Sequence, residues 1–457
     1  MKVVLLFFAL LAAAIGLSPT APAQTDTVPV DSLMQKLDRL DQEVRILKRQ
    51  RELEQEALAA KPKDAPQVVA GPDGFALKTA DGNHILRLRG LNQADSRFFI
   101  DEEKDPFVNG FFIRRLRFVM EGTIAKSFDF RFMPDFAGGV VQLLDAYVDA
   151  RIAPEFKARF GKLKPPVGLE RLQSPQNLLF IERGLPTLLV PNRDIGVQLH
   201  GDLLGGALQY QAGVFNGVPD GRNSDLDIHD NKDYAARLFA TPFAKSDIPA
   251  LEGLGIGVAG STGNEHGTLA APALPTYLSP GQFVVFRYRN DGTDDGTVLA
   301  SGSIARISPQ AYYSFGPFSF LGEYVQSTQE VIRAAARTKL SNIAYQAAGS
   351  FVITGENASY RGVVPRNPFS LEDGTWGALE IAVRFHALDV DDDAFPTFAN
   401  PTNSVTGETA TTLGLNWYLN KSLRVGINYD QTRFKGGATT GDRSVEKAVF
   451  TRVSIYI

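Results

Sequence analysis

The chain is defined first by what it lacks. Its 457 residues contain no cysteine, only 2 tryptophans, 4 methionines and 5 histidines, and the formal net charge is −4. Without cysteine there can be no disulfide framework and no thiolate metal site. The histidines show no metal-ligand spacing, and neither a phosphate-binding Walker loop nor a G-x-S-x-G elbow occurs, so no cofactor and no enzyme activity is expected. The weak net charge gives no long-range attraction for nucleic acid.

Long hydrophobic runs are almost absent as well. One run, Val3 to Leu17, follows the positive charge of Lys2 and precedes the small residues Ala21-Pro22-Ala23. This pattern predicts a signal peptide over residues 1–23, cleaved before Gln24. The run is shorter than the roughly 20 residues of a membrane-spanning helix, so removal is expected rather than anchoring. No other segment is apolar enough to span as a helix, so we expect the mature chain to leave the cytoplasm without helical spans.

Residues 31–58 carry a heptad pattern. Their apolar positions are separated by alternating steps of four and three residues, with charges between them: Leu33, Leu37, Leu40, Val44 and Leu47. Such an a/d seam predicts a coiled-coil helix over 31–58, placed in the periplasm. About three heptads are marginal for an isolated coil, so a single solvated helix is the alternative. Residues 59–83 are expected to form a linker.

From His84 to Ile457 the pattern changes to a period of two, in segments rich in the chain's 31 phenylalanines and 13 tyrosines. In residues 112–124 one face is predicted to hold Phe112, Leu116, Phe118, Met120 and Ile124, and the other Ile113, Arg115, Arg117, Val119 and Glu121. A soluble sandwich would also alternate. Charges deep within the polar faces and almost unbroken apolar faces instead favour a barrel with lipid outside and water inside.

The alternating segments number about sixteen, so an all-β transmembrane antiparallel barrel is predicted over residues 84–457. The expected strand starts are Ile85, Phe111, Phe128, Leu143, Phe156, Ile195, Ala207, Tyr234, Leu254, Ser303, Phe318, Ile343, Trp376, Thr409, Leu423 and Ala448. Short turns alternate with long polar loops, as between periplasmic and outer sides. Gly355 to Thr375 is an exception, a long connection where a short turn is due. The even count places both chain ends on the periplasmic side.

An ordered series of segments resembles the phosphate-selective porin O and P family from about Ile85 to Ile457. It includes RRLRFVMEGTI, DFRFMPDFAGG, DAYVDARIAPEFKARFGKLKPPVGLERLQSPQNLLFIERG, WGALEIAVRF and LGLNWYLNKSLRVGINYDQTRF. The resemblance implies a sixteen-stranded homotrimeric barrel in the bacterial outer membrane with an inward-folded third loop. It also implies anion selectivity from basic residues at the constriction, used for phosphate or polyphosphate uptake.

The third long connection, Lys162 to Asp194, is rich in basic residues and in prolines that would stiffen it. A stiff loop in the lumen can hold the planar fork of arginine and the point charge of lysine against phosphate. Basic residues on the early strands could face it. An exposed loop of solvated charges, or ion pairs along the pore wall, are the alternatives. The candidate anion-binding residues are Arg115, Arg117, Arg131, Arg159, Lys162, Lys164, Arg171, Arg183 and Arg193.

The sequence therefore predicts a porin for passive diffusion of small anions, with phosphate, polyphosphate or chloride as solutes. A general or other-anion porin is the alternative within transport. A structural protein that tethers the outer membrane through its coil is a second alternative. An outer-membrane esterase using His200 is a third, although a polar pore-wall residue explains His200 better. The acidic run Asp389 to Asp393 is expected to be a solvated loop rather than a calcium site.

Overall fold

The computed structural model describes residues 30–59, 65–71, 74–100, 108–227 and 230–457. The chain divides into two compact units, Met1–Ala65 and Pro66–Ile457. The predicted signal peptide, residues 1–23, lies outside the described residues.

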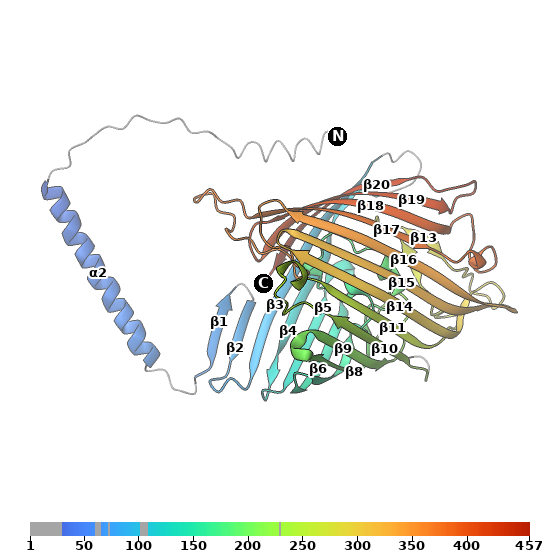
Figure 1. Ribbon diagram of the computed structural model, residues 1–457, viewed down its shortest axis with the longest axis horizontal. Helices are drawn as coiled ribbons and strands as arrows, with labels where there is room; N and C mark the ends of the chain where they lie inside the picture. The colour runs from blue at the N-terminus through green and yellow to red at the C-terminus, as the bar shows by residue number, and fades with distance from the viewer. Residues whose placement is uncertain (1–29, 60–64, 72–73, 101–107, 228–229) are drawn as a thin grey trace. The chain divides into compact units, whose positions relative to one another are not determined.

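The first unit contains a single described helix, α2 (Val30–Ala59), at the position where the heptad pattern predicts one (Figure 1). Its apolar seam faces solvent, since Leu37, Leu40, Val44 and Leu47 are 62%, 57%, 44% and 63% exposed. Ion pairs one turn apart, such as Arg45 with Asp41 at 2.7 Å, stabilise the helix along its own surface. Among the described residues, no helix combines the length and the hydropathy needed to cross a bilayer.

The second unit is a closed antiparallel barrel of 16 strands (Figure 1). Its strands are β3 (Ile85–Phe99), β4 (Gly110–Ile124), β5 (Phe128–Asp135), β6 (Gln142–Ala153), β7 (Phe156–Leu163), β8 (Asp194–Leu203), β9 (Leu208–Phe215), β10 (Asp233–Ala240), β11 (Gly255–His266), β14 (Leu299–Phe315), β15 (Phe318–Arg333), β16 (Ala336–Val352), β17 (Ala378–Asp389), β18 (Val405–Tyr418), β19 (Leu423–Gly436) and β20 (Glu446–Tyr456). Each strand pairs with the next, and β20 pairs with β3. Closure pairs the first and last strands of the barrel wall, as a bilayer demands.

The two faces of the barrel are those of a membrane pore. On β17, Ile381 and Val383 are 47% and 50% exposed on the outside, whereas Glu380 and Arg384 on the inside are 3% and 1% exposed. The same inversion recurs on the neighbouring strands. Apolar side chains therefore point outward and charged side chains inward, as the period-two pattern predicts.

The predicted starts identify all sixteen strands, and the largest shift is at β16. This strand begins at Ala336, not at Ile343, because β15 and β16 continue outward to a hairpin with only Ala334 and Ala335 between them. The polar outer part of such a strand lacks the apolar alternation from which the start was predicted.

The predicted faces of β4 are wrong at its outer end. Pairing passes from Gln93↔Arg115 directly to Ala94↔Ile113, so Arg114 is the extra residue of a β-bulge. The bulge turns Ile113 outward, 46% exposed, and brings Phe112 inward beside the Arg97 guanidinium at 5.0 Å. A strict period of two cannot anticipate this reversal.

Two connections carry short strands of their own. The loop between β11 and β14 holds the hairpin β12 (Thr276–Leu278) and β13 (Val284–Arg287). In the predicted linker, β1 (Gln67–Gly71) and β2 (Gly74–Lys78) form a hairpin. β2 pairs with Ile85–Leu88 of β3, and β20 pairs with Leu91–Phe99 of the same strand.

The connection between β16 and β17 is long, as predicted, and part of it folds into the barrel. Buried Ala358 and Val363 pack with Tyr418, which fixes the connection to the wall. The Tyr360 hydroxyl donates to the carbonyl of Leu169 at 2.6 Å. Residue 169 belongs to the connection between β7 and β8, at the opposite end of the barrel, so connections from both ends meet in the lumen.

Candidate functional site

The connection between β7 and β8, residues 164–193, is called the third loop and lies inside the barrel. The Ile181 amide donates to Asn428 of β19 at 2.7 Å, and the Ile181 carbonyl accepts from Arg452 of β20 at 2.6 Å. The Leu185 amide donates to Nδ1 of His386 on β17 at 3.2 Å. These strands are far from β7 and β8 in the strand order, so the loop crosses the lumen.

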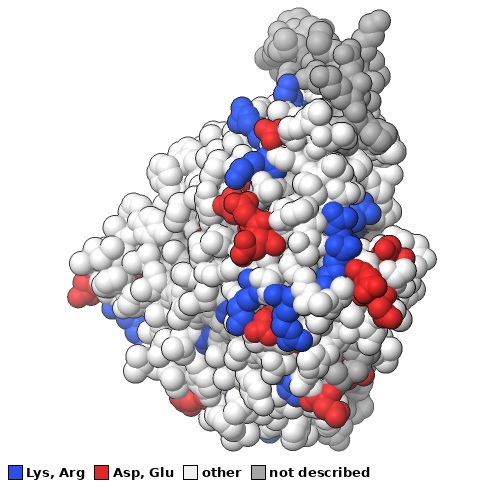
Figure 2. Space-filling view, turned by 90° about the vertical axis from the view of Figure 1, so that its right-hand side faces the viewer, with Lys and Arg blue, Asp and Glu red and all other residues white. Residues whose placement is uncertain are grey.

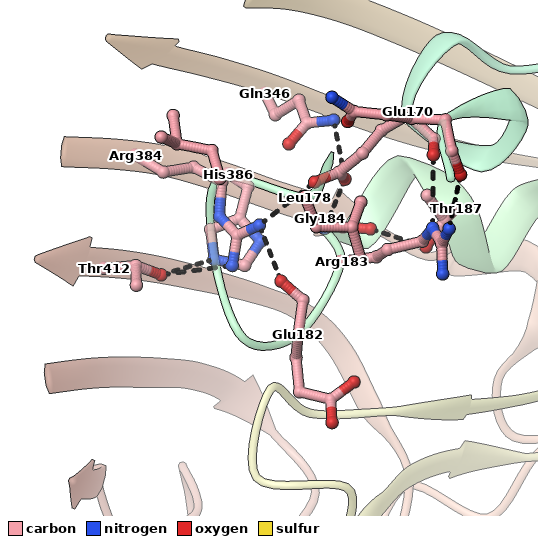
Figure 3. A network of polar contacts seen from close by, with 12 residues as sticks. Glu170, Leu178, Glu182, Arg183, Gly184, Thr187, Gln346, Arg384, His386 and Thr412 are labelled. Atoms are coloured by element: carbon pink, nitrogen blue, oxygen red, sulfur yellow. Dashed lines mark hydrogen bonds and ion pairs between the residues drawn. The ribbon is translucent and has the colours of Figure 1, made fainter. Parts of the chain in front are cut away.

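Carboxylates and one amide hold the start of the loop against the wall. Glu323 of β15 accepts from the amides of Leu169 at 2.5 Å and Glu170 at 3.3 Å. Gln346 of β16 donates to the carboxylates of both Glu323 and Glu170, each at 3.1 Å. Glu170 also lies 3.6 Å from Arg384. Figure 3 shows Glu170 together with Gln346 and Arg384.

Gly184 is required at the tightest contact between loop and wall. A Cβ at this position would lie 2.1 Å from the side-chain oxygen of Gln346. The Gly184 amide donates to Glu170 at 2.7 Å, so the close approach also closes a bond within the loop. Figure 3 shows Gly184 close to Glu170 and to the wall residues Gln346 and His386.

Three cations of the loop, Lys164, Arg171 and Arg183, form no ion pair with any carboxylate of the described residues. The Lys164 ammonium donates to the carbonyls of residues 171, 172 and 173 at 2.6, 3.3 and 3.2 Å. Arg183 donates to the carbonyls of residues 170 and 173 at 3.1 and 2.8 Å. Arg171 donates to Asn192 at 3.1 Å and to the Thr187 carbonyl. We call them the loop cations.

The loop cations repel one another. Burial lowers the pKa of Lys164 well below its ordinary value, and the neighbouring charges of Arg193 and Arg183 lower it further. Burial, with Arg183 and Arg193 nearby, lowers the pKa of Arg171 to about 9. Burial also lowers the pKa of Arg183 to about 10, against the opposing attraction of Glu170. This local excess of positive charge would be relieved by an anion.

The other predicted residues lie elsewhere or are paired. Arg115 is buried and donates to Gln93 at 2.6 Å, without an ion pair among the described contacts. The remaining five form ion pairs: Arg117 with Asp135 at 2.7 Å, Arg131 with Glu121 at 3.2 Å, Arg159 with Asp149 at 2.5 Å, Arg193 with Asp145 at 3.0 Å, and Lys162 with Asp225. Arg117 and Arg193 still contribute positive charge near Arg183, whereas Arg131, Arg159 and Lys162 are neutralised on the wall.

Sequence reasoning missed several residues that contact the loop. Arg114 donates two bonds to Glu182, at 2.7 and 3.1 Å, and reaches the lumen only because of the bulge. Arg384 and Arg452 alternate with exposed apolar residues on β17 and β20 and so face the lumen, but nothing in the sequence pairs them with the loop. Arg384 donates to the Glu182 carbonyl at 3.0 Å, and Arg452 forms a two-bond pair with Asp95, both at about 2.6 to 2.7 Å.

A basic cavity of about 670 Å³ lies among the outer connections. Its described lining includes Asp291 and four arginines: Arg222, Arg287, Arg289 and Arg333. By contrast, Figure 2 shows a face on which basic and acidic side chains lie in small adjacent groups, without one continuous basic patch. Positive charge is thus concentrated at sites such as this cavity and is not spread over the face shown in Figure 2.

The described residues hold no group of three or more histidine, aspartate or glutamate side chains placed to bind a metal ion. Asp391, in the acidic run Asp389 to Asp393, accepts hydrogen bonds from the amides of Asp393 at 3.0 Å and Ser341 at 2.7 Å. Its carboxylate thus serves the local backbone.

Comparison with known proteins agrees with this architecture. The chain is 23% identical over 422 residues to Porin O of Pseudomonas aeruginosa, covering 83% of this chain and 91% of that protein. The outer membrane channel DcaP of Acinetobacter baumannii superposes with a TM-score of 0.52 at 10% identity, over 82% of this chain and 98% of that one. An anion-selective porin from Comamonas acidovorans gives a TM-score of 0.52 at 10% identity, over 82% and 100%.

These structural likenesses show the fold of outer-membrane porins, which is a channel fold. The model of one family, phosphate-selective porin O and P, matches residues 86–452. The match spans nearly the whole barrel, and the chain therefore belongs to the phosphate-selective porin O and P family.

Proposed function

We propose that the protein is an outer-membrane porin through which small anions diffuse, and that the third loop narrows the water-filled lumen. The observation that carries the proposal is the set of loop cations. Lys164, Arg171 and Arg183 are held by carbonyl and amide oxygens, whose partial charges leave most of each positive charge uncompensated. Phosphate or polyphosphate is the proposed solute, since the chain's family and the arginine forks both suit it.

The mechanism would be exchange of solvation. An anion that reaches the loop loses part of its water and gains charge-assisted hydrogen bonds from ammonium and guanidinium groups. Each loop cation keeps part of its surface exposed to solvent, so water can compete and release the anion again. Repulsion among the cations, together with Arg117 and Arg193, keeps the site poised for a negative ligand.

The outer cavity is proposed to collect anions before they enter. Arg289 and Arg333 donate to the carbonyls of Pro396 and Thr397 at 3.0 and 2.9 Å, so they too are held without an ion pair to a described carboxylate. The homotrimer and the periplasmic position of helix α2 are proposed with the function. They are supported by the family resemblance and by the even strand count.

Single-channel recording tests the proposal. The folded protein in a planar bilayer under a potassium chloride gradient should show a reversal potential that favours chloride, and low phosphate should block the chloride current. The triple variant Lys164→Gln, Arg171→Gln and Arg183→Gln should lose most of the block. Arg151→Gln is the matched control, because this wall arginine pairs with Asp129 at 3.0 Å and lies away from the loop.

A cation-favouring potential in the unmodified protein would contradict an anion porin. Equal phosphate block in the triple variant would show that the loop cations do not bind phosphate.

A general diffusion porin is the second candidate. It is favoured by the pairing of most lumen basics with acids, as in Arg159 with Asp149 and Arg306 with Asp220, both at 2.5 Å. That function predicts weak anion preference and no block by phosphate.

A further inference from the structure

Helix α2 presents an apolar seam that no other described residue of the first unit covers. Leu37, Leu40, Val44 and Leu47 are each at least 44% exposed, although they follow the heptad spacing of a buried seam. An exposed stripe of this kind on a helix is the usual mark of a partner helix. Because the seam repeats every seven residues, the partner that fits it is a helix with the same repeat.

The charges beside the seam identify the partner. With Leu40 and Leu47 at d and Leu37 and Val44 at a, the g positions are Lys36, Glu43 and Gln50, and the e positions are Asp41, Lys48 and Gln55. In a parallel coil a g residue meets the e residue five positions later on the other helix. Among the described side chains, the facing pairs are then Lys36 with Asp41 and Glu43 with Lys48.

Both of these pairs are complementary between two copies of the same sequence, because each joins opposite charges. Within the described helix neither Lys36 nor Lys48 has an ion pair, whereas Arg45 pairs with Asp41 and Arg39 with Glu43 along the helix, at 2.7 and 3.6 Å. Both lysines are thus available to a second chain.

We propose that helix α2 is a self-association surface, and that its occupant is helix α2 of further copies of this chain, parallel and in register. The inference is independent of the proposed anion function, since it concerns the first unit alone. A different protein, or a single helix left in solvent, is the competing occupant that the test must exclude.

The absence of cysteine makes a direct test possible in the full-length protein. Leu40→Cys and Val44→Cys each place one thiol in the seam, and Gln42→Cys places one on the opposite face as the matched control. A disulfide needs Cα atoms roughly 4.4–6.8 Å apart, which only equivalent positions of aligned parallel helices provide. The detergent-solubilised protein is oxidised, and cross-linked dimer is quantified on a denaturing gel.

We expect at least about tenfold more cross-linked dimer for both seam variants than for the control. In the Leu40→Cys background, Glu43→Lys should reduce cross-linking because it sets like charges against each other, and adding Lys48→Glu should restore it. Rescue by the second change separates paired recognition from simple apolar contact.

Failure of both seam thiols to cross-link in folded protein would overturn the proposal, as would equal cross-linking at Gln42. Seam cross-links without charge rescue would overturn the parallel, in-register arrangement. The heat-dependent gel mobility of the barrel reports whether each variant is folded, and conductance is measured separately. An error in the anion function therefore cannot be mistaken for an error here.

Discussion

The substitution Glu323→Gln should loosen the third loop without unfolding the barrel. Glu323 accepts three hydrogen bonds, from the amides of Leu169 and Glu170 and from Gln346. Hydrogen bonds to a charged group contribute about 1.5–3 kcal/mol each. Glutamine keeps one acceptor oxygen and turns a donor toward the loop amides, so about 2–4 kcal/mol of docking free energy should be lost.

Part of that loss is offset. The carboxylate of Glu170 shares Gln346 with Glu323, and removing one negative charge relieves their repulsion. We therefore expect the lower half of the range. Since every 1.4 kcal/mol is tenfold, the loop amides should exchange with solvent on the order of 30-fold faster or more. The strands keep their full ladder, because β15 still pairs with β14 and β16.

Hydrogen exchange measured by mass spectrometry is the assay, with peptides from residues 165–190 compared against peptides from β15 and β16. Glu330→Gln is the control, since Glu330 lies on the same strand and pairs with Lys339 at 3.2 Å away from the loop. Unchanged exchange of the loop amides in Glu323→Gln would refute the anchoring argument. Equal acceleration in loop and strands would show that the carboxylate stabilises the barrel as a whole.

Three further outcomes follow from the same contacts. Glu182→Gln should shift the reversal potential toward chloride, because it frees the charge of Arg114, which the carboxylate neutralises at 2.7 Å. Burial lowers the pKa of Lys164, so its charge is lost as the pH rises, and anion selectivity should weaken at pH values below the ordinary pKa of lysine. The variant Lys164→Arg should retain its selectivity over the same pH range. Asp95→Asn should lower stability by about 3 kcal/mol, because buried Arg452 loses its two short bonds to Asp95 and keeps only the more distant Glu182, at 3.8 Å, and the Ile181 carbonyl.

The stability prediction has a matched control, and each of the other two has an outcome that would contradict it. Asp129→Asn removes an acid from a pair that is 43% and 35% exposed, and should cost at most about 1 kcal/mol in the same unfolding assay. Selectivity that stays flat across the alkaline range would argue against a role for Lys164. A shift of Glu182→Gln toward potassium would contradict the neutralising role of its carboxylate.

Much of the barrel is predictable from sequence because lipid and water impose a period of two on every strand. Strand number, order and the long connection between β16 and β17 all follow from that pattern. The prediction fails where lipid and water no longer impose this period. The outer part of β16 lies beyond the apolar alternation, and the bulge at Arg114 adds one residue that no composition marks.

The site is harder to predict because its members meet only after closure. Proline content and basic residues identify the third loop, and four of the nine predicted cations, Arg115 and the three loop cations, form no ion pair with a described carboxylate. Whether a given arginine is neutralised depends on a partner from another strand, as with Arg193 and Asp145, 48 residues apart. Contacts of Arg384 and Arg452 with the loop backbone leave no local signal at all.

The hairpin β1–β2 bears on how the barrel avoids misassembly. β20 covers only part of the edge of β3, and Ile457 forms the last bonds with Gly90. On the N-terminal side of Gly90, β2 pairs with the same edge of β3. The first barrel strand therefore offers no open row of amides and carbonyls with which another chain could pair. The free edge is displaced to β1, whose five residues end in glycine and form a much poorer template for aggregation.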